Sequence, residues 1–204
     1  MAKFSSSHYA LSEEEKVKKA VSVLQRDGLV VYPTETVYGL GADALSKNAV
    51  LKVFEAKSRP LGKPISVAVS DVEMIFGIAH VDKFAEAFIT KFLPGPVTVV
   101  LPVKNSLPED LSGGTGTIGI RYPDHELALK IIATLDSPIT STSANISGEV
   151  SPTTAEMVNV PHDFLVDGGT LLGTPSTVVN LVDRRIERPG AMLDEVVHFL
   201  KHEE

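Results

Sequence analysis

The sequence predicts an α/β fold in which helices flank a twisted, mixed β-sheet. Amphipathic helical segments and short β-branched runs are interspersed along all 204 residues, without the regular strand–helix–strand alternation of a purely parallel sheet. No change of composition marks a linker, and there is no internal repeat or low-complexity segment. Residues 1–204 are therefore expected to form a single domain with a sizeable core.

Capping signals and apolar spacing define the elements of the first half. Ser12 with Glu15, and Ser70 with Glu73, pair an N-cap hydroxyl with an acidic residue three positions later, which is typical of a helix start. Apolar residues then recur at helical spacing, whereas dense β-branched runs indicate strands. Helices are expected over 12–28, 46–57, from 70 onward and over 82–92, and strands over 29–32, 65–69 and 97–103.

The second half continues the same mixture. A glycine-rich loop precedes the run Thr117–Arg121, whose alternation places Thr117, Gly119 and Arg121 on one face of a strand. Further strands are expected over 164–166, 176–182 and 185–188, and helices over 125–135, 154–158 and 193–202.

Composition limits the classes of function. The net charge of −7 argues against a protein that binds duplex nucleic acid mainly by neutralising phosphates, and favours a small anionic ligand in a locally basic pocket. Cysteine is absent, which excludes disulfides and thiolate chemistry. No apolar run approaches the roughly 20 residues that span a membrane. Met1–Ala10 lacks the pattern of a secretory signal, so a cytoplasmic location is expected.

The most unusual stretch is Ser137–Gly148, which contains six hydroxyl side chains and one carboxamide, none of them charged. Two interpretations stay open from the stretch alone. It is either a polar turn rich in capping residues or a surface that presents short hydrogen-bond donors to an oxyanion such as a phosphate chain.

Several cations and hydroxyls are candidates for completing such a site. Lys57 and Arg59 stand at the end of a predicted helix, where they either complement the helix C-terminus or, with Lys63, bind phosphates. Arg121 ends a strand and is either a surface residue or a fork for a carboxylate. Arg188 is a similar case, and Ser176 is either a turn cap or a ligand. No Ser–His–Asp arrangement can be placed, so electrostatic rather than covalent chemistry is favoured.

Together these segments resemble the YrdC family of threonylcarbamoyl-AMP synthases. The matching pieces follow the family order over nearly the whole chain: Tyr32–Leu40, Lys57–Pro60, Pro94–Thr98, Gly119–Pro123, Ser141–Gly148, Pro175–Val179 and Arg188–Gly190. The resemblance implies a twisted mixed sheet that encloses a deep, positively charged cavity. It also implies the conversion of L-threonine, bicarbonate and ATP to threonylcarbamoyl-AMP and pyrophosphate, for the N6-threonylcarbamoyl modification of adenosine 37 in tRNA.

The resemblance also implies roles for individual residues. Lys57 and Arg59 are the expected catalytic cations. The expected threonine ligands are Thr34, Arg121, Ser141 and Ser176. The expected ATP ligands are Arg59, Lys63, Thr117, Ser143, Asn145, Ser151 and Arg188. No protein metal site is expected, and Mg²⁺ would arrive with ATP. A separate threonylcarbamoyl-transferase complex would accept the product.

Two positions depart from the family pattern. Lys63 stands where many members have Asn, and Ala68 stands where they have a His that helps to hold threonine. Two alternatives to the synthase function stay open: a module that binds double-stranded RNA or tRNA, and a paralogous hydrolase of the modified tRNA or of the adenylate.

Overall fold

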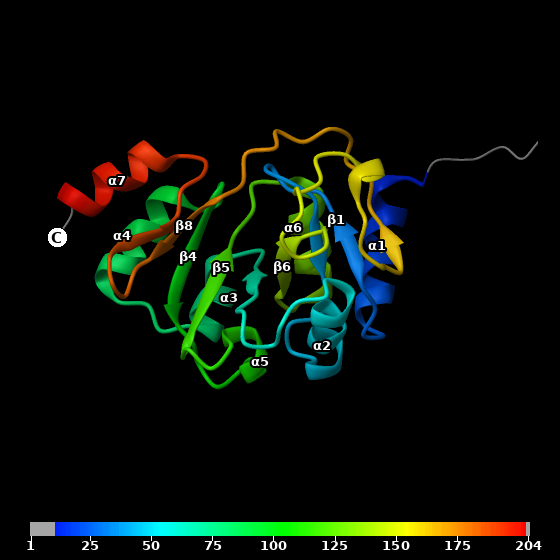
Figure 1. Cartoon of the computed structure of the whole chain (residues 1–204), viewed down its shortest axis with the longest axis horizontal. Coiled ribbons are helices and arrows are strands. Elements are labelled where there is room, and N and C mark those ends of the chain that lie inside the picture. The colour runs from blue at the N-terminus through cyan, green and yellow to red at the C-terminus, as the bar shows by residue number, and fades with distance from the viewer. Residues whose placement is uncertain (1–10, 203–204) are drawn as a thin grey trace, which may run out of the picture.

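The computed structural model describes residues 11–202, and within them nine strands form one twisted mixed sheet flanked by helices (Figure 1). The segment Met1–Ala10, on which the expectation about a secretory signal rests, lies outside the described residues, as do residues 203–204. The strands are β1 (Val30–Tyr32), β2 (Gly39–Gly41), β3 (Ser66–Ala68), β4 (Val97–Pro102), β5 (Thr117–Arg121), β6 (Ile139–Ser143), β7 (Phe164–Leu165), β8 (Thr177–Asn180) and β9 (Arg185–Arg188). The helices are α1 (Glu13–Leu24), α2 (Lys47–Ala56), α3 (Val72–Ile78), α4 (Lys83–Phe92), α5 (Glu109–Ser112), α6 (Glu126–Leu135) and α7 (Leu193–His202), with a 3₁₀ turn at Ala155–Met157.

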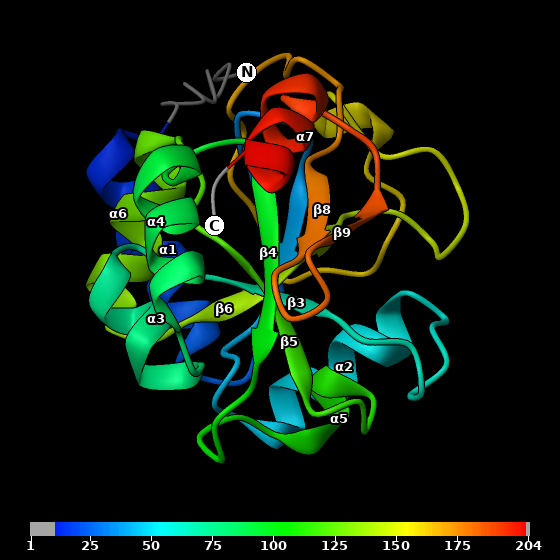
Figure 2. The same ribbon diagram turned by 90° about the vertical axis from the view of Figure 1, so that its left-hand side faces the viewer.

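The strand order confirms that the sheet is mixed. It runs β7-β1-β2-β6-β3-β5-β4-β8-β9, with parallel pairing of β1 with β7, β3 with β5 and β4 with β8, and antiparallel pairing elsewhere. Figure 2 shows α1, α3, α4 and α6 on one side of this sheet, with α2 and α5 near its lower edge. Within residues 11–202, no helix combines the length and the apolarity needed to cross a membrane.

Apolar burial holds the helices to the sheet. The faces of α1 and α6 enclose buried side chains with β1, among them Leu24, Tyr32 and Ile131. Helix α7 docks on α4 through Phe199, whose ring centroid lies 5.1 to 5.6 Å from those of three α4 phenylalanines. Full burial of an aromatic side chain of this size contributes roughly 1.5–3 kcal/mol.

The capping box at Ser12 is confirmed, but the one expected at Ser70 is wrong by one residue. Asp71 is the N-cap of α3, and its carboxylate accepts from the backbone N–H of Met74 at 2.8 Å. Ser70 instead donates its hydroxyl to Asp71. A charged acceptor forms the stronger hydrogen bond with a helix N–H, so the aspartate takes the cap in preference to the neighbouring serine.

The stretch that begins at Ser137 is not a polar turn throughout. Its residues Ile139–Ser143 form β6, which pairs with β2 on one side and β3 on the other in the middle of the sheet. Thr140 is fully buried there. Its hydroxyl is satisfied in the core, since it donates to the carbonyl of Leu40 and accepts from the N–H of Ala42. Ser141 and Ser143 stay half-buried, and this places their hydroxyls along one hollow of the sheet.

Candidate functional site

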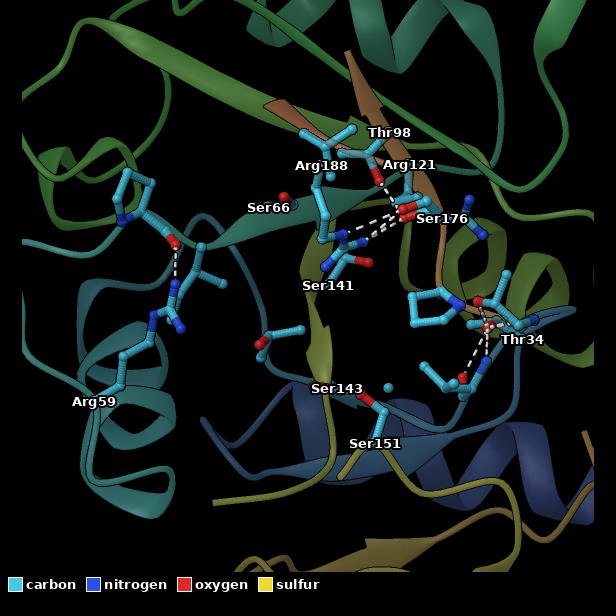
Figure 3. Close-up of a pocket in the computed structure, with 18 residues that line it drawn as sticks. Thr34, Arg59, Ser66, Thr98, Arg121, Ser141, Ser143, Ser151, Ser176 and Arg188 are labelled. Atoms are coloured by element: carbon cyan, nitrogen blue, oxygen red, sulfur yellow. Dashed lines mark hydrogen bonds between the residues drawn. The ribbon is translucent and has the colours of Figure 1, made fainter. Parts of the chain in front are cut away.

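A cavity of ≈ 230 Å³ lies over β6 and the strands and loops around it (Figure 3). It brings together most of the residues that the sequence singled out: Thr34, Arg59, Arg121, Ser141, Ser143, Ser151, Ser176 and Arg188. Lys57, Lys63, Thr117 and Asn145 are not among its lining residues. The lining contains three arginines and many hydroxyls but no histidine and no carboxylate. Such a surface is suited to binding an anion and offers no general base of its own.

Sequence reasoning missed several polar residues of this cavity. Thr36, Ser66 and Thr98 line it beside the expected residues. Ser66 and Thr98 stand on strands, and the period-2 alternation of side chains along β3 and β4 could have indicated the face on which they lie. Glu35, which sits behind the lining, had no comparable signal because its partner is 86 residues away in the sequence.

Arg121 lies at the end of β5 and is 5% exposed. Its Nη1 donates to the carbonyls of Gly95 and Val97, at 2.8 and 3.3 Å, and its Nη2 donates to Glu35 Oε1 at 2.7 Å. It is therefore not a surface residue, and it already has a carboxylate partner within the protein. The fork expected from the sequence is present, but part of its donor capacity is used.

Arg188 and Ser176 form one unit on the neighbouring wall. The Arg188 guanidinium donates to the carbonyl of Ser176 at 2.7 Å and to its hydroxyl at 3.0 Å (Figure 3). Thr98 shares a 2.8 Å hydrogen bond with the same hydroxyl. Burial, with a smaller contribution from Arg121, lowers the pKa of Arg188. The rotation of the Ser176 hydroxyl is thus restricted from two sides.

Arg59 and Lys63 differ in what they can offer the cavity. The Arg59 guanidinium donates to the backbone carbonyls of Lys63 and Pro64, at 3.2 and 2.7 Å, and this fixes it against the loop that follows α2. Burial lowers the pKa of Arg59. Lys63 supplies one of the two backbone carbonyls that Arg59 binds. Lys63 itself is exposed and does not line the cavity.

Lys57 is a buried lysine, 2% exposed, directly after α2. Its Nζ donates to the backbone carbonyls of Ser143 and Asn145, and its own carbonyl accepts from the N–H of Ser147 at 3.0 Å. Three bonds therefore tie this residue to the turn that follows β6. The ammonium does not line the cavity, but its bond to the carbonyl of Ser143 places its charge behind a residue that does.

Lys57 is expected to titrate far below an ordinary lysine. Burial, with a smaller contribution from the charge of Arg59, lowers its pKa from 10.5 to about 8. The chemical shift of ¹³Cε in lysine-labelled protein should follow this midpoint, and Arg59→Gln should raise it. Between pH 8 and 10.5 the unfolded chain keeps a proton that the folded chain has released, so this group makes the free energy of unfolding rise with pH. A midpoint near 10 would contradict the description of Lys57 as a desolvated cation.

Gly119 on β5 allows the close approach of Ser66 on β3, which lines the cavity. A Cβ atom on this glycine would lie 2.4 Å from Ser66 Oγ and 3.1 Å from Ser66 Cβ. Gly119→Ala is therefore expected to displace the Ser66 side chain and to lower the free energy of unfolding by about 1–3 kcal/mol, the usual cost of overpacking. Chemical denaturation measures this, with Gly77→Ala as a control, because a Cβ atom there meets nothing within 4 Å. An unchanged stability for Gly119→Ala would show that β3 adjusts freely.

The fold and the cavity define an α/β protein in which arginines and hydroxyls form a lining suited to a small anionic ligand. The chain belongs to the Sua5/YciO/YrdC family: its residues 22–190 match the model of that family, which is described as "telomere recombination".

Two curated relatives and one solved structure are similar to most of the chain. The chain is 42% identical over 195 residues to the threonylcarbamoyl-AMP synthase of Pyrococcus abyssi, covering 90% of this chain and 57% of that protein. It is 38% identical to the threonylcarbamoyl-AMP synthase of Bacillus subtilis, covering 91% and 56%. The crystal structure of P. abyssi Sua5 complexed with L-threonine has the same fold, with a TM-score of 0.88 and 38% identity over 93% of this chain and 58% of that one. The chain thus spans little more than half the length of these relatives.

Proposed function

We propose that this protein is a threonylcarbamoyl-AMP synthase that uses L-threonine, bicarbonate and ATP. The observation that carries the proposal is the convergence of Arg59, Arg121 and Arg188 on a cavity lined with hydroxyls. The similarity to proteins named as threonylcarbamoyl-AMP synthases, and to P. abyssi Sua5 solved with L-threonine, supports the choice of substrates. The product would serve the N6-threonylcarbamoyl modification of tRNA, after transfer by a separate complex.

The lining residues divide between the two larger substrates. Threonine would be held by Thr34, Arg121, Ser141 and Ser176, with Arg121 on its carboxylate. ATP would be held by Arg59, Ser143, Ser151 and Arg188. The cavity is smaller than the roughly 300–1,000 Å³ of typical ligand pockets, so we propose that it takes threonine and the phosphate chain and leaves the nucleoside toward its mouth.

The chemistry requires alignment and charge neutralisation rather than a protein nucleophile. The amine of threonine and bicarbonate combine with loss of water to give a carbamate. An oxygen of the carbamate then attacks the α-phosphorus, and the bond to the departing pyrophosphate breaks. Preorganised arginines would stabilise the charge that develops on the phosphate oxygens, and Lys57 would add a positive charge behind Ser143.

A dedicated Mg²⁺ site does not fit the cavity. Its lining contains no carboxylate, and within residues 11–202 no group of three or more acidic or histidine side chains is placed to hold a metal ion. Mg²⁺ supplied with ATP would therefore be bound through the phosphate oxygens, as magnesium often is in nucleotide enzymes.

Release of pyrophosphate tests the proposal. The protein is incubated with ATP and Mg²⁺, with and without L-threonine and bicarbonate, and pyrophosphate is measured over time. We expect release that depends on both additions, together with an adenylate product that contains the threonine carbon skeleton. Release that is no faster with threonine and bicarbonate than without them would refute the synthase function.

A further inference from the structure

The partners of Arg121 leave it a defined number of free donors. A guanidinium has five N–H donors, and the structure uses three of them on Gly95, Val97 and Glu35. The two that are left are Nε–H and one Nη2–H. Two donors on neighbouring nitrogens are what a carboxylate takes in a bidentate contact. The internal bonds of Arg121 therefore occupy Nη1 and leave donors on Nε and Nη2.

Of these three partners, Glu35 binds Arg121 through its side chain. Its Oε1 accepts from Arg121 Nη2 at 2.7 Å and from the backbone N–H of Asp124 at 3.2 Å, so one oxygen is fixed to both the guanidinium and the turn after β5. Its Oε2 is buried without a hydrogen-bond partner. Glu35 stands between two lining residues, Thr34 and Thr36, yet does not itself line the cavity. It therefore acts behind the arginine and does not reach the ligand.

A purely stabilising ion pair is the alternative, and its energetics do not favour it. Burying a charged pair costs desolvation that its attraction often fails to exceed, so such a pair is weak support for stability. An acid that leaves one oxygen without a partner is poorly optimised for that purpose. Its bond to Nη2 does hold the guanidinium plane in place, which reduces the ordering that ligand binding would otherwise require.

We propose that Glu35 is a positioning residue that holds Arg121 so that Nε and Nη2 grip the carboxylate of L-threonine. The identity of the ligand rests on the proposed function, whereas the positioning of Arg121 does not.

Two substitutions separate placement from charge. Glu35→Gln keeps an oxygen at the position that Arg121 and Asp124 share but removes the charge. Glu35→Asp keeps the charge but shortens the side chain by one methylene, so that one oxygen no longer reaches both partners. By calorimetry, we expect Glu35→Gln to bind L-threonine within threefold of the unmodified protein and Glu35→Asp to bind it at least tenfold more weakly. ATP affinity should change less than threefold in both.

A second measurement, on the protein without threonine, tests whether Glu35 holds the Arg121 guanidinium in place. In NMR spectra of arginine-labelled protein, we expect slowly exchanging Nη–H signals of Arg121 in the unmodified chain and in Glu35→Gln. In Glu35→Asp we expect averaged signals. The signals are assigned to Arg121 by their loss in Arg121→Lys. Equal signals in all three proteins, or a Glu35→Gln that binds threonine as weakly as Glu35→Asp, would overturn the inference. If the unmodified protein binds no L-threonine, the proposed function fails, and the Nη–H signals alone decide the role of Glu35.

Discussion

Arg121→Ala is expected to weaken L-threonine binding by a factor of about 100 or more, and to change ATP affinity by no more than about threefold. The two free donors of Arg121 would form charge-assisted hydrogen bonds, each contributing roughly 1.5–3 kcal/mol, and tenfold in affinity corresponds to about 1.4 kcal/mol. ATP would keep Arg59 and Arg188, which have their own backbone partners. Calorimetric titration with each substrate measures the difference.

The control for Arg121→Ala must account for Glu35, which would be left buried and unpaired. Removal of one member of a buried ion pair costs about 3–5 kcal/mol of stability, so the alanine variant needs a check of its folding. Arg121→Lys keeps a positive charge beside Glu35 but cannot form a bidentate contact, and we expect it to fold and to bind threonine about tenfold more weakly. Arg59→Ala should show the opposite selectivity, with the larger loss for ATP. Equal losses of both substrates in Arg121→Ala would contradict the assigned role.

The sequence predicted the elements well where the signal is local. The box of Ser12 and Glu15 correctly started α1, and the apolar spacing of α4 and α6 gave these helices within a residue or two of their ends. Strand β2 was missed because two of its three residues are glycine. The structure gives the reason: a Cβ atom on Gly39 or Gly41 would come within 2.8 or 3.0 Å of the Tyr32 ring on β1.

The sequence predicted which residues line the candidate site better than it predicted the hydrogen bonds among them. Cations and hydroxyls at element ends pointed to the cavity, and the motif resemblance divided them between substrates. The hydrogen bonds that hold these residues in place join positions far apart in the chain. They connect Lys57 with the carbonyls of Ser143 and Asn145, and Thr98 with Ser176. Only the order of strands in the sheet brings such residues together, and no local pattern encodes that order.

Lys57→Met is expected to lower the rate of pyrophosphate formation by a factor of about 10²–10³ while the protein remains folded. Methionine fills similar space without charge, so the substitution removes the positive charge behind Ser143 and two donors to buried carbonyls. Removal of a donor in direct contact with developing charge costs a factor of this size in other enzymes, which sets the upper bound for Lys57, because its ammonium acts from behind Ser143. The turn itself keeps other bonds, since Ser147 N–H still reaches the carbonyl of residue 57 and Asn145 Nδ2 still donates to the carbonyl of Glu149.

The dependence of the rate on pH tests whether the charge of Lys57 contributes to the reaction or Lys57 has only a packing role. Because the pKa of Lys57 lies at about 8, the cation is lost as pH rises through that value, and the rate of the unmodified protein should fall there. In Lys57→Met this falling limb should be absent and the residual rate flat across it. Lys52→Met is the matched control: Lys52 lies on α2, the helix that Lys57 follows, is exposed and donates to the carbonyl of Asp27, so both the rate and the limb should be retained. A Lys57→Met protein that keeps the limb would assign that titration to another group and leave Lys57 with a structural role alone.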